Sequence, residues 1–168
     1  MSDKILVAYT TAAGSTGEIA EIVGQVLADG GAAVDVRPTA EVQDLSPYRA
    51  VVVGTGIRAG NVYQKTLAFL DTHQQALGQV PVAYFVVCLT MKEDNEENRR
   101  RVNTYVDQMR AKAPQVKPVD VGCFGGLLDF KRLPLVLRLI MKMRKEQEGD
   151  YRDWNAIRAW ASGVGAAL

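Results

Sequence analysis

Apolar residues along the chain fall into short continuous runs, which alternate with longer stretches of helical spacing. The continuous runs predict five buried strands, at Ile5–Tyr9, Ala33–Arg37, Ala50–Gly54, Val80–Leu89 and Lys117–Phe124. The helical spacing predicts helices at Ser15–Asp29, Val62–Leu77 and Asn95–Lys112, and in a tail from Leu133 that is broken near Gly149. This alternation predicts one α/β domain over residues 1–168, with a parallel sheet covered by helices on both faces.

The loop after the first predicted strand carries the clearest candidate chemistry. It joins a strand to a helix, so free backbone N–H groups and the positive end of the helix dipole meet there. Threonine and serine hydroxyls add donors, and a glycine lets the backbone curve around an anion. The candidate phosphate-binding residues are Thr10, Thr11, Ala12, Ala13, Gly14, Ser15 and Thr16.

The same loop has a second interpretation. Ser15-x-x-Glu18 matches a capping box, which would start a helix without binding any ligand. If a phosphate does bind, the loop itself offers it no Lys or Arg. Neutral donors suit a phosphate monoester better than a triphosphate with magnesium.

The pattern Val7-x-Tyr9-x-Thr11-x-x-Gly14-x-Thr16-x-x-x-Ala20-x-x-Val23 resembles the flavodoxin signature, with Ala8 as the one departure. The resemblance implies a three-layer sandwich with strand order 2-1-3-4-5 and an FMN cofactor, with the Thr11 and Thr16 hydroxyls on its phosphate. It also implies that loops after the third and fourth strands flank the flavin ring. Those candidates are Thr55, Gly56, Ile57, Arg58, Gly60, Leu89, Thr90 and Met91.

The glycines from Gly54 to Gly60 are spaced too widely for a dinucleotide fingerprint, and no acidic residue follows to hold a ribose. The two cysteines, Cys88 and Cys123, lie in apolar runs and are interpreted as buried, reduced thiols. The single histidine, His73, is expected to face solvent, so neither a metal site nor a Cys–His nucleophile is expected.

The 20 basic and 19 acidic residues nearly balance, which gives no reason to expect a nucleic-acid partner. Electron-carrying flavodoxins are typically acidic and stack aromatic rings on the flavin. Here the loops Thr55–Asn61 and Leu89–Asp94 hold no Phe, Tyr or Trp. An uncovered flavin face would leave room for a substrate.

Residues 131–145 interleave apolar residues with six basic residues and no acidic one. Such a stretch can lie on an anionic membrane surface or bind an apolar molecule that carries carboxylates. It can also be a core-packing helix with one solvated face. The candidates for carboxylates or lipid headgroups are Lys131, Arg132 and Arg138.

Three further features resemble the menaquinone-dependent protoporphyrinogen oxidases, a flavodoxin-like family of haem synthesis. They are Gly54-x-x-Ile57-Arg58-x-Gly60, an insertion at about 126–150 that ends in Leu139-Ile140-Met141-Lys142-Met143, and Tyr151-x-Asp153-Trp154. The early insertion departs from the family, which is richer there in Tyr, Trp and Arg.

This second resemblance implies an FMN-dependent oxidoreductase that oxidises protoporphyrinogen IX and passes electrons to a quinone. Arg58 would either stabilise charge on the reduced flavin or pair with a propionate. With neither a secretory signal nor a bilayer-length apolar segment in the sequence, we expect a cytoplasmic protein, placed at the inner face of the cell membrane if residues 131–145 bind lipid. The alternative is an electron carrier, or an FMN module that serves a partner reductase.

Overall fold

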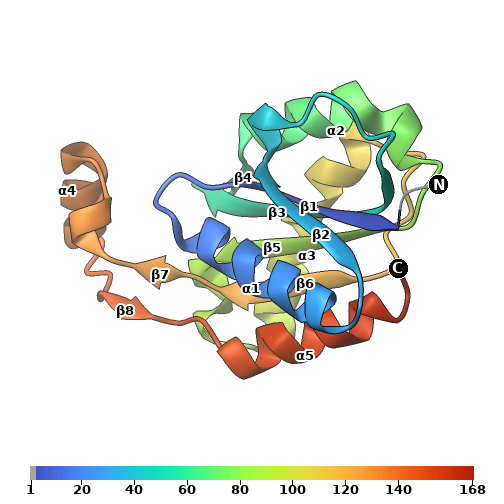
Figure 1. The fold of residues 1–168 in the computed structure, drawn as a ribbon. Helices are drawn as coiled ribbons and strands as arrows, with labels where there is room; N and C mark the ends of the chain where they lie inside the picture. Colours follow the sequence, from blue (N-terminus) through green and yellow to red (C-terminus); the bar gives the residue numbers. More distant parts are fainter. Residues whose placement is uncertain (1–2) are drawn as a thin grey trace.

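A parallel sheet runs through the middle of the computed structural model, which describes residues 3–168. Its strand order is β2-β1-β3-β5-β6, and the short strand β4 pairs antiparallel with β3 (Figure 1). Counted along the chain without β4, this is the predicted order 2-1-3-4-5. The strands are β1 (Lys4–Thr10), β2 (Ala33–Pro38), β3 (Tyr48–Arg58), β4 (Asn61–Val62), β5 (Val82–Cys88) and β6 (Val121–Gly125).

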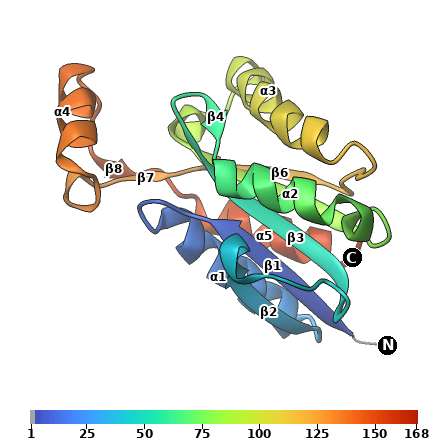
Figure 2. The ribbon, with the colours of Figure 1, turned by 90° about the horizontal axis from the view of Figure 1, so that it is seen from above.

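Helices cover both faces of this sheet, which confirms the three-layer sandwich (Figure 2). Helices α1 (Ser15–Asp29) and α5 (Trp154–Gly165) pack on one face, and α2 (Gln64–Leu77) and α3 (Glu96–Lys112) pack on the other. Every residue of β5 is buried as a result. This explains why the strand reads as an unbroken apolar run rather than an alternating one. Single 3-10 turns occupy Thr39–Glu41, Leu89–Lys92 and Phe130–Arg132.

The third strand is longer than its apolar run predicts. It continues past Gly54 to Arg58 and then turns back through Ala59 and Gly60, which adopt left-handed φ angles of 50° and 76°. Val62, predicted to start a helix, instead pairs with Ile57 in the β3–β4 turn, and α2 begins at Gln64. Residues 56–60 of this extension and its turn line the pocket described below. At the other end of the sheet, β6 begins at Val121 rather than Lys117.

Residues 126–150, called the arm below, leave the sheet after β6 and return before α5. The arm contains β7 (Leu127–Leu128), α4 (Leu135–Met143) and β8 (Gly149–Asp150), and β7 pairs antiparallel with β8. Both views show α4 standing apart from the layered body (Figures 1 and 2). The sequence predicts a helical break near Gly149. In the structure α4 ends at Met143 and α5 begins at Trp154, so the break spans residues 144–153.

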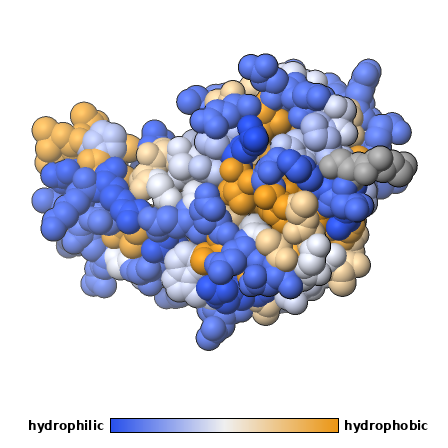
Figure 3. All heavy atoms as spheres, viewed as in Figure 1, coloured by the Kyte–Doolittle hydropathy of each residue, from blue (hydrophilic) through white to orange (hydrophobic). Residues whose placement is uncertain are grey.

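None of the residues in α4 is buried, so the interpretation of 131–145 as a core-packing helix is wrong. Its exposed apolar side chains include Leu135, Val136, Leu139 and Met143, which are 67%, 69%, 54% and 82% exposed. Figure 3 shows apolar surface on this protruding helix, with hydrophilic surface beside it. Across residues 3–168, no helix combines the length and the apolar character needed to cross a membrane.

Candidate functional site

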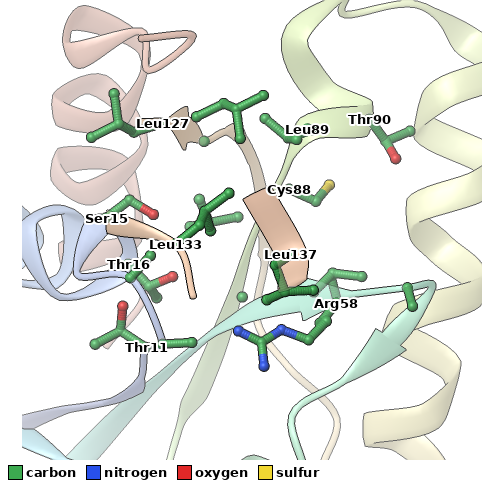
Figure 4. A pocket seen from close by; sticks show the side chains of 18 of the residues that line it. Thr11, Ser15, Thr16, Arg58, Cys88, Leu89, Thr90, Leu127, Leu133 and Leu137 are labelled. Carbon is green, nitrogen blue, oxygen red and sulfur yellow. The ribbon is translucent and has the colours of Figure 1, made fainter. Parts of the chain in front are cut away.

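A pocket of about 280 Å³ lies at the carboxyl ends of the parallel strands, between the sheet and the arm. Three loops form its walls on the sheet side: the loop after β1, the β3–β4 turn and the segment after β5. Parallel α/β sheets bind ligands in this position, where neighbouring crossovers diverge. Figure 4 shows Thr11, Ser15 and Thr16 on one side of the pocket and Arg58 on the other.

The loop after β1 has the geometry of an anion cradle. Its Gly14 occupies the N-cap position of α1 with a left-handed φ of 94°, and no side chain caps the helix. The first turn of a helix leaves its N–H groups without an intrahelical acceptor, and two residues of this turn, Ser15 and Thr16, line the pocket. The Thr11 hydroxyl accepts a 2.9 Å hydrogen bond from the Gly14 N–H, which fixes the shape of the loop.

The capping-box interpretation of this loop does not match the structure. Ser15 is already inside the helix, and the Glu18 carboxylate receives hydrogen bonds from Arg132 and Arg152 instead of a backbone N–H group. The first turn is therefore left open to an external anion. An uncapped first turn of α1 offers N–H groups that suit the phosphate of a flavin.

Most residues predicted for the site line one pocket although they come from three separate segments. Gly56 shows how tightly they approach, because a Cβ atom there would lie 2.7 Å from the Tyr63 ring and 3.2 Å from the Thr16 hydroxyl. The predicted residues found in the lining are Thr11, Ala12, Ala13, Ser15, Thr16, Gly56, Ile57, Arg58, Gly60, Leu89 and Thr90.

Four predicted residues lie outside the lining. The Thr10 hydroxyl shares a 2.7 Å hydrogen bond with Thr39, and Thr55 is fully buried and bonded to Thr66. Met91 is buried in the core on the α2–α3 side of the sheet. Gly14 shapes the loop but does not line the pocket. Side-chain direction separates Thr10, Thr55 and Met91 from their neighbours, and a motif does not encode that direction.

Several lining residues were not predicted, and most come from the arm or from helices. Leu133, Leu137 and Met141 follow each other at intervals of four, which is the spacing of one helical face. Leu137 and Met141 lie in α4 and Leu133 lies just before it, while other apolar residues of α4 stay exposed. Tyr105 reaches the pocket from α3, and nothing local to its sequence announces this. The other residues missed are Ala59, Tyr63, Val87, Cys88, Gly126, Leu127, Leu128, Arg144 and Glu146.

Arg58 and Tyr63 form the charged and aromatic side of the pocket. The Arg58 guanidinium lies 5.7 Å from the centre of the Tyr63 ring, close enough for a cation–π contact. Burial raises the pKa of Tyr63, and the nearby Arg58 charge partly opposes that rise. With Tyr105 on the same pocket, aromatic rings are present even though the two flavin-flanking loops contain none.

The two cysteines differ in how deeply they are buried. Cys88 is buried and lies beside the pocket, whereas Cys123 is half-buried, less enclosed than predicted. Burial raises the pKa of Cys88, and it raises the pKa of Cys123 to about 11. Both side chains are therefore neutral thiols near pH 7, which makes them poor nucleophiles.

His73, expected to face solvent, is half-buried, and its ring centre lies 4.8 Å from that of Phe69.

The three basic candidates of the arm have separate surroundings. Arg132 lies against the loop after β1, with its Nη1 2.9 Å from the Glu18 carboxylate. Arg138 donates a 3.3 Å hydrogen bond to the Leu133 carbonyl, within the arm. Only Lys131 extends to solvent without an ion pair among residues 3–168.

Comparisons with known proteins agree with this architecture. The flavodoxin domain model matches residues 6–155. The chain is 28% identical to a protoporphyrinogen IX dehydrogenase (quinone) of Leishmania major, covering 98% of this chain and 76% of that protein. It is 26% identical to the protein of the same name from Escherichia coli K12, covering 94% and 92%.

Among solved structures, a short-chain flavodoxin associated with a bacterial microcompartment superposes with a TM-score of 0.62. Its sequence is 16% identical, and the match covers all of both chains. The fold, the open first turn of α1 and the family model lead to one conclusion. The chain belongs to the flavodoxin domain family, which indicates that it binds FMN.

Proposed function

We propose that this protein oxidises protoporphyrinogen IX to protoporphyrin IX on FMN and passes the electrons to a quinone. Bound FMN supplies two-electron redox chemistry, and the protein positions the reactants around it. Each turnover removes two electrons and two protons from the macrocycle and reduces one quinone to quinol. Conversion of one protoporphyrinogen IX to protoporphyrin IX removes six hydrogens, so it takes three turnovers and three quinones. The near full-length similarity to two proteins named for this reaction supports the proposal.

The position of the arm favours oxidation of a bound substrate over simple electron transfer. Its inner face places Leu133, Leu137 and Met141 along the pocket, opposite the loops that are expected to hold FMN. An aliphatic wall of this kind suits a flat apolar ligand, because apolar surface is removed from water without leaving a polar group unpaired. An electron carrier that docks through surface charge has no need for such a wall.

Two sets of hydrogen-bond donors in the pocket have distinct proposed roles. The guanidinium of Arg58 offers a planar pair of N–H groups that can donate to both oxygens of a propionate carboxylate. On the opposite side, the Thr11 and Thr16 hydroxyls and the open N–H groups of α1 would hold the FMN phosphate. The phosphate and the substrate carboxylate are thus assigned to different walls of one pocket.

The decisive assay mixes FMN-loaded protein, protoporphyrinogen IX and menadione under anaerobic conditions and follows the appearance of porphyrin fluorescence. We expect turnover that exceeds the enzyme-free rate and depends on the quinone. L137Q places an unpaired amide in the apolar wall and should lower kcat/KM about tenfold, as one buried unsatisfied polar group costs about 1–3 kcal/mol. Val119→Gln, an exposed apolar residue away from the pocket, is the matched control.

A flavin-loaded protein that gives no porphyrin would contradict the oxidase assignment. It would leave FMN binding in place and favour the electron carrier or partner-reductase module. Colourless protein after incubation with excess FMN, with no heat of association by calorimetry, would instead remove the cofactor.

A second proposal concerns where the reaction takes place: the outer face of α4 contacts an anionic membrane surface. Apolar Leu135, Leu139 and Met143 are exposed there, and the exposed Lys131, Lys142 and Lys145 lie on the same segment. Apolar insertion and cationic headgroup contacts act together in such helices, and each basic residue near the surface contributes about 1 kcal/mol. Arg132 and Arg138 contribute less than the sequence suggested, because both have partners within the chain.

Sedimentation with phosphatidylglycerol vesicles tests this contact. The protein should sediment with them and remain free with phosphatidylcholine vesicles. L135Q/L139Q/M143Q should lower binding at least tenfold, while V119Q should not change it. If the triple variant changes only the oligomeric state measured by gel filtration, α4 contacts a second copy of the chain and the membrane proposal is wrong.

A further inference from the structure

The two ends of the arm converge on one carboxylate, Glu18, which lies in the first turns of α1 just after the loop that the proposed function assigns to the FMN phosphate. Arg132, near the start of the arm, binds one Glu18 oxygen at 2.9 Å, and Arg152, just after its end, binds the other. These partners are 114 and 134 residues away along the chain. The sequence therefore gives no local sign that they meet.

Arg152 is held too rigidly to be an incidental surface contact. Its side chain is only 7% exposed, and its Nε and Nη2 each donate a 2.8 Å hydrogen bond to the Asp150 carboxylate. The guanidinium also lies 4.7 Å from the centre of the Trp154 ring. Two carboxylates and one aromatic face thus fix a planar cation, which is the geometry that arginine serves and lysine cannot.

Arg132 brings the arm directly onto the phosphate loop. A Cβ atom on Gly14 would lie 3.4 Å from its Nη1, and the same nitrogen is 3.5 Å from the Ala13 carbonyl oxygen. The arm is also tied at its base, where the Tyr151 N–H donates to the Gly126 carbonyl at 3.0 Å. Movement of the arm away from the pocket therefore requires Arg132 to leave the loop.

We propose that Glu18 is a positioning residue that latches the arm to the phosphate loop, so that FMN binding and closure of the arm over the pocket strengthen each other. An anion in the loop orders Ala13 and Gly14, against which Arg132 packs, and a seated Arg132 in turn holds the loop in its binding shape. Coupling of this kind is reciprocal by thermodynamic necessity. The proposal rests on the phosphate-loop part of the proposed function and is independent of the substrate.

Hydrogen–deuterium exchange of the full-length protein, with and without FMN, measures the latch directly. FMN should slow amide exchange in residues 133–146 of the wild-type protein. R132Q should exchange about fivefold faster there, even without FMN, and should weaken FMN binding about two- to fivefold, the scale of a partly exposed ion pair. R132K keeps the charge and should recover part of both effects.

A matched control is R100Q, which removes an exposed ion pair with Glu96 on α3, at 3.4 Å. It should change neither arm exchange nor FMN affinity. The effect of E18Q/R132Q should be less than the sum of the effects of E18Q and R132Q, because the two residues form one ion pair. Circular dichroism identifies any variant that fails to fold. If the variants that contain E18Q do not fold, the comparison of R132Q with wild-type protein tests the latch.

Equal arm exchange in R132Q, R100Q and wild-type protein would overturn the latch. So would protection of the arm by FMN that persists unchanged in R132Q. A protein that binds no FMN would remove the proposed function, and the comparison of R132Q with R100Q without FMN would still test whether Glu18 holds the arm.

Discussion

At the scale of single residues, side-chain direction decides which member of a motif does the chemistry. Thr10, Thr11 and Thr16 belong to one Thr-rich run, yet only Thr11 and Thr16 line the pocket. The Thr10 hydroxyl is bonded to Thr39 beside β2. The sequence therefore predicts the place of the loop, and the fold divides its hydroxyls between the ligand and the core.

Replacing Thr16 with valine should weaken FMN binding while preserving side-chain shape. Hydrogen bonds to a charged group contribute about 1.5–3 kcal/mol, so the dissociation constant should rise by roughly 10- to 150-fold. T10V removes a hydroxyl that faces Thr39 and should change it less than about twofold. Titration of FMN fluorescence measures both constants, and equal effects of the two variants would contradict the assignment of Thr16.

The charge on Glu18 should give unfolding a specific pH dependence. Hydrogen bonds from Arg152 are the largest cause that lowers its pKa below the ordinary 4.5, and Arg132 adds to the effect. A lowered pKa stabilises the folded state fully above the unfolded-state value, and the stabilisation is lost as pH falls through the folded-state value. Wild-type protein should exceed E18Q in free energy of unfolding by a constant amount from pH 7 to about pH 5, and the difference should shrink below that. A constant difference down to pH 3, measured by urea unfolding, would show that Glu18 does not act through its charge.

At the scale of elements, close packing between neighbours explains which segments tolerate change. A Cβ atom on Gly54 in β3 would lie 2.0 Å from the Phe85 ring of β5, whereas one on Gly163 in α5 would meet nothing within 4 Å. Both positions are glycine, but only the first is required by its surroundings. The same contrast separates the inner face of α4, which lines the pocket, from its exposed outer face.

Two alanine substitutions should therefore act in opposite directions. G54A forces strands apart or distorts Phe85 and should lower the free energy of unfolding by about 1–3 kcal/mol or more. G163A replaces the least favourable non-proline residue in a helix and should raise it by about 0.5–1 kcal/mol. Urea unfolding followed by circular dichroism measures both, and a stable G54A protein would show that the sheet can yield at this contact.

At the scale of the whole molecule, the sequence predicts the layered core far better than the arm. The buried strands and amphipathic helices carry their own periodicity, which predicts a sheet covered on both faces. The strand order is implied by the resemblance to flavodoxins, and the structure has that order. The pocket-facing interval Leu133–Leu137–Met141 is visible in the sequence, but which face turns inward depends on tethers such as Arg132. Ion pairs between residues more than a hundred positions apart leave no local pattern. That residues 1–168 form one domain stays a prediction.

Cofactor binding should stabilise the entire fold, because the loops proposed to hold FMN follow three strands of one sheet and line one pocket. At a free FMN concentration one hundred times the dissociation constant, the stabilisation is about 2.7 kcal/mol. For a chain of this length, that corresponds to a rise in Tm of roughly 5–11 °C. Differential scanning calorimetry across an FMN series checks it. A Tm that does not depend on FMN concentration would mean that the loops bind no flavin in the folded state.

The pairing of β7 with β8 has a consequence for how such proteins diversify. Leu127 lies opposite Asp150, and the Tyr151 N–H bonds to Gly126, so the segment begins and finishes at one spot on the scaffold. The two ends of the segment are hydrogen-bonded to each other, so the segment can be replaced as one unit. Exchanging residues 127–149 for the corresponding stretch of a relative, with Glu18, Arg132, Asp150 and Arg152 retained, offers a route to new ligand preferences that leaves the central sheet untouched.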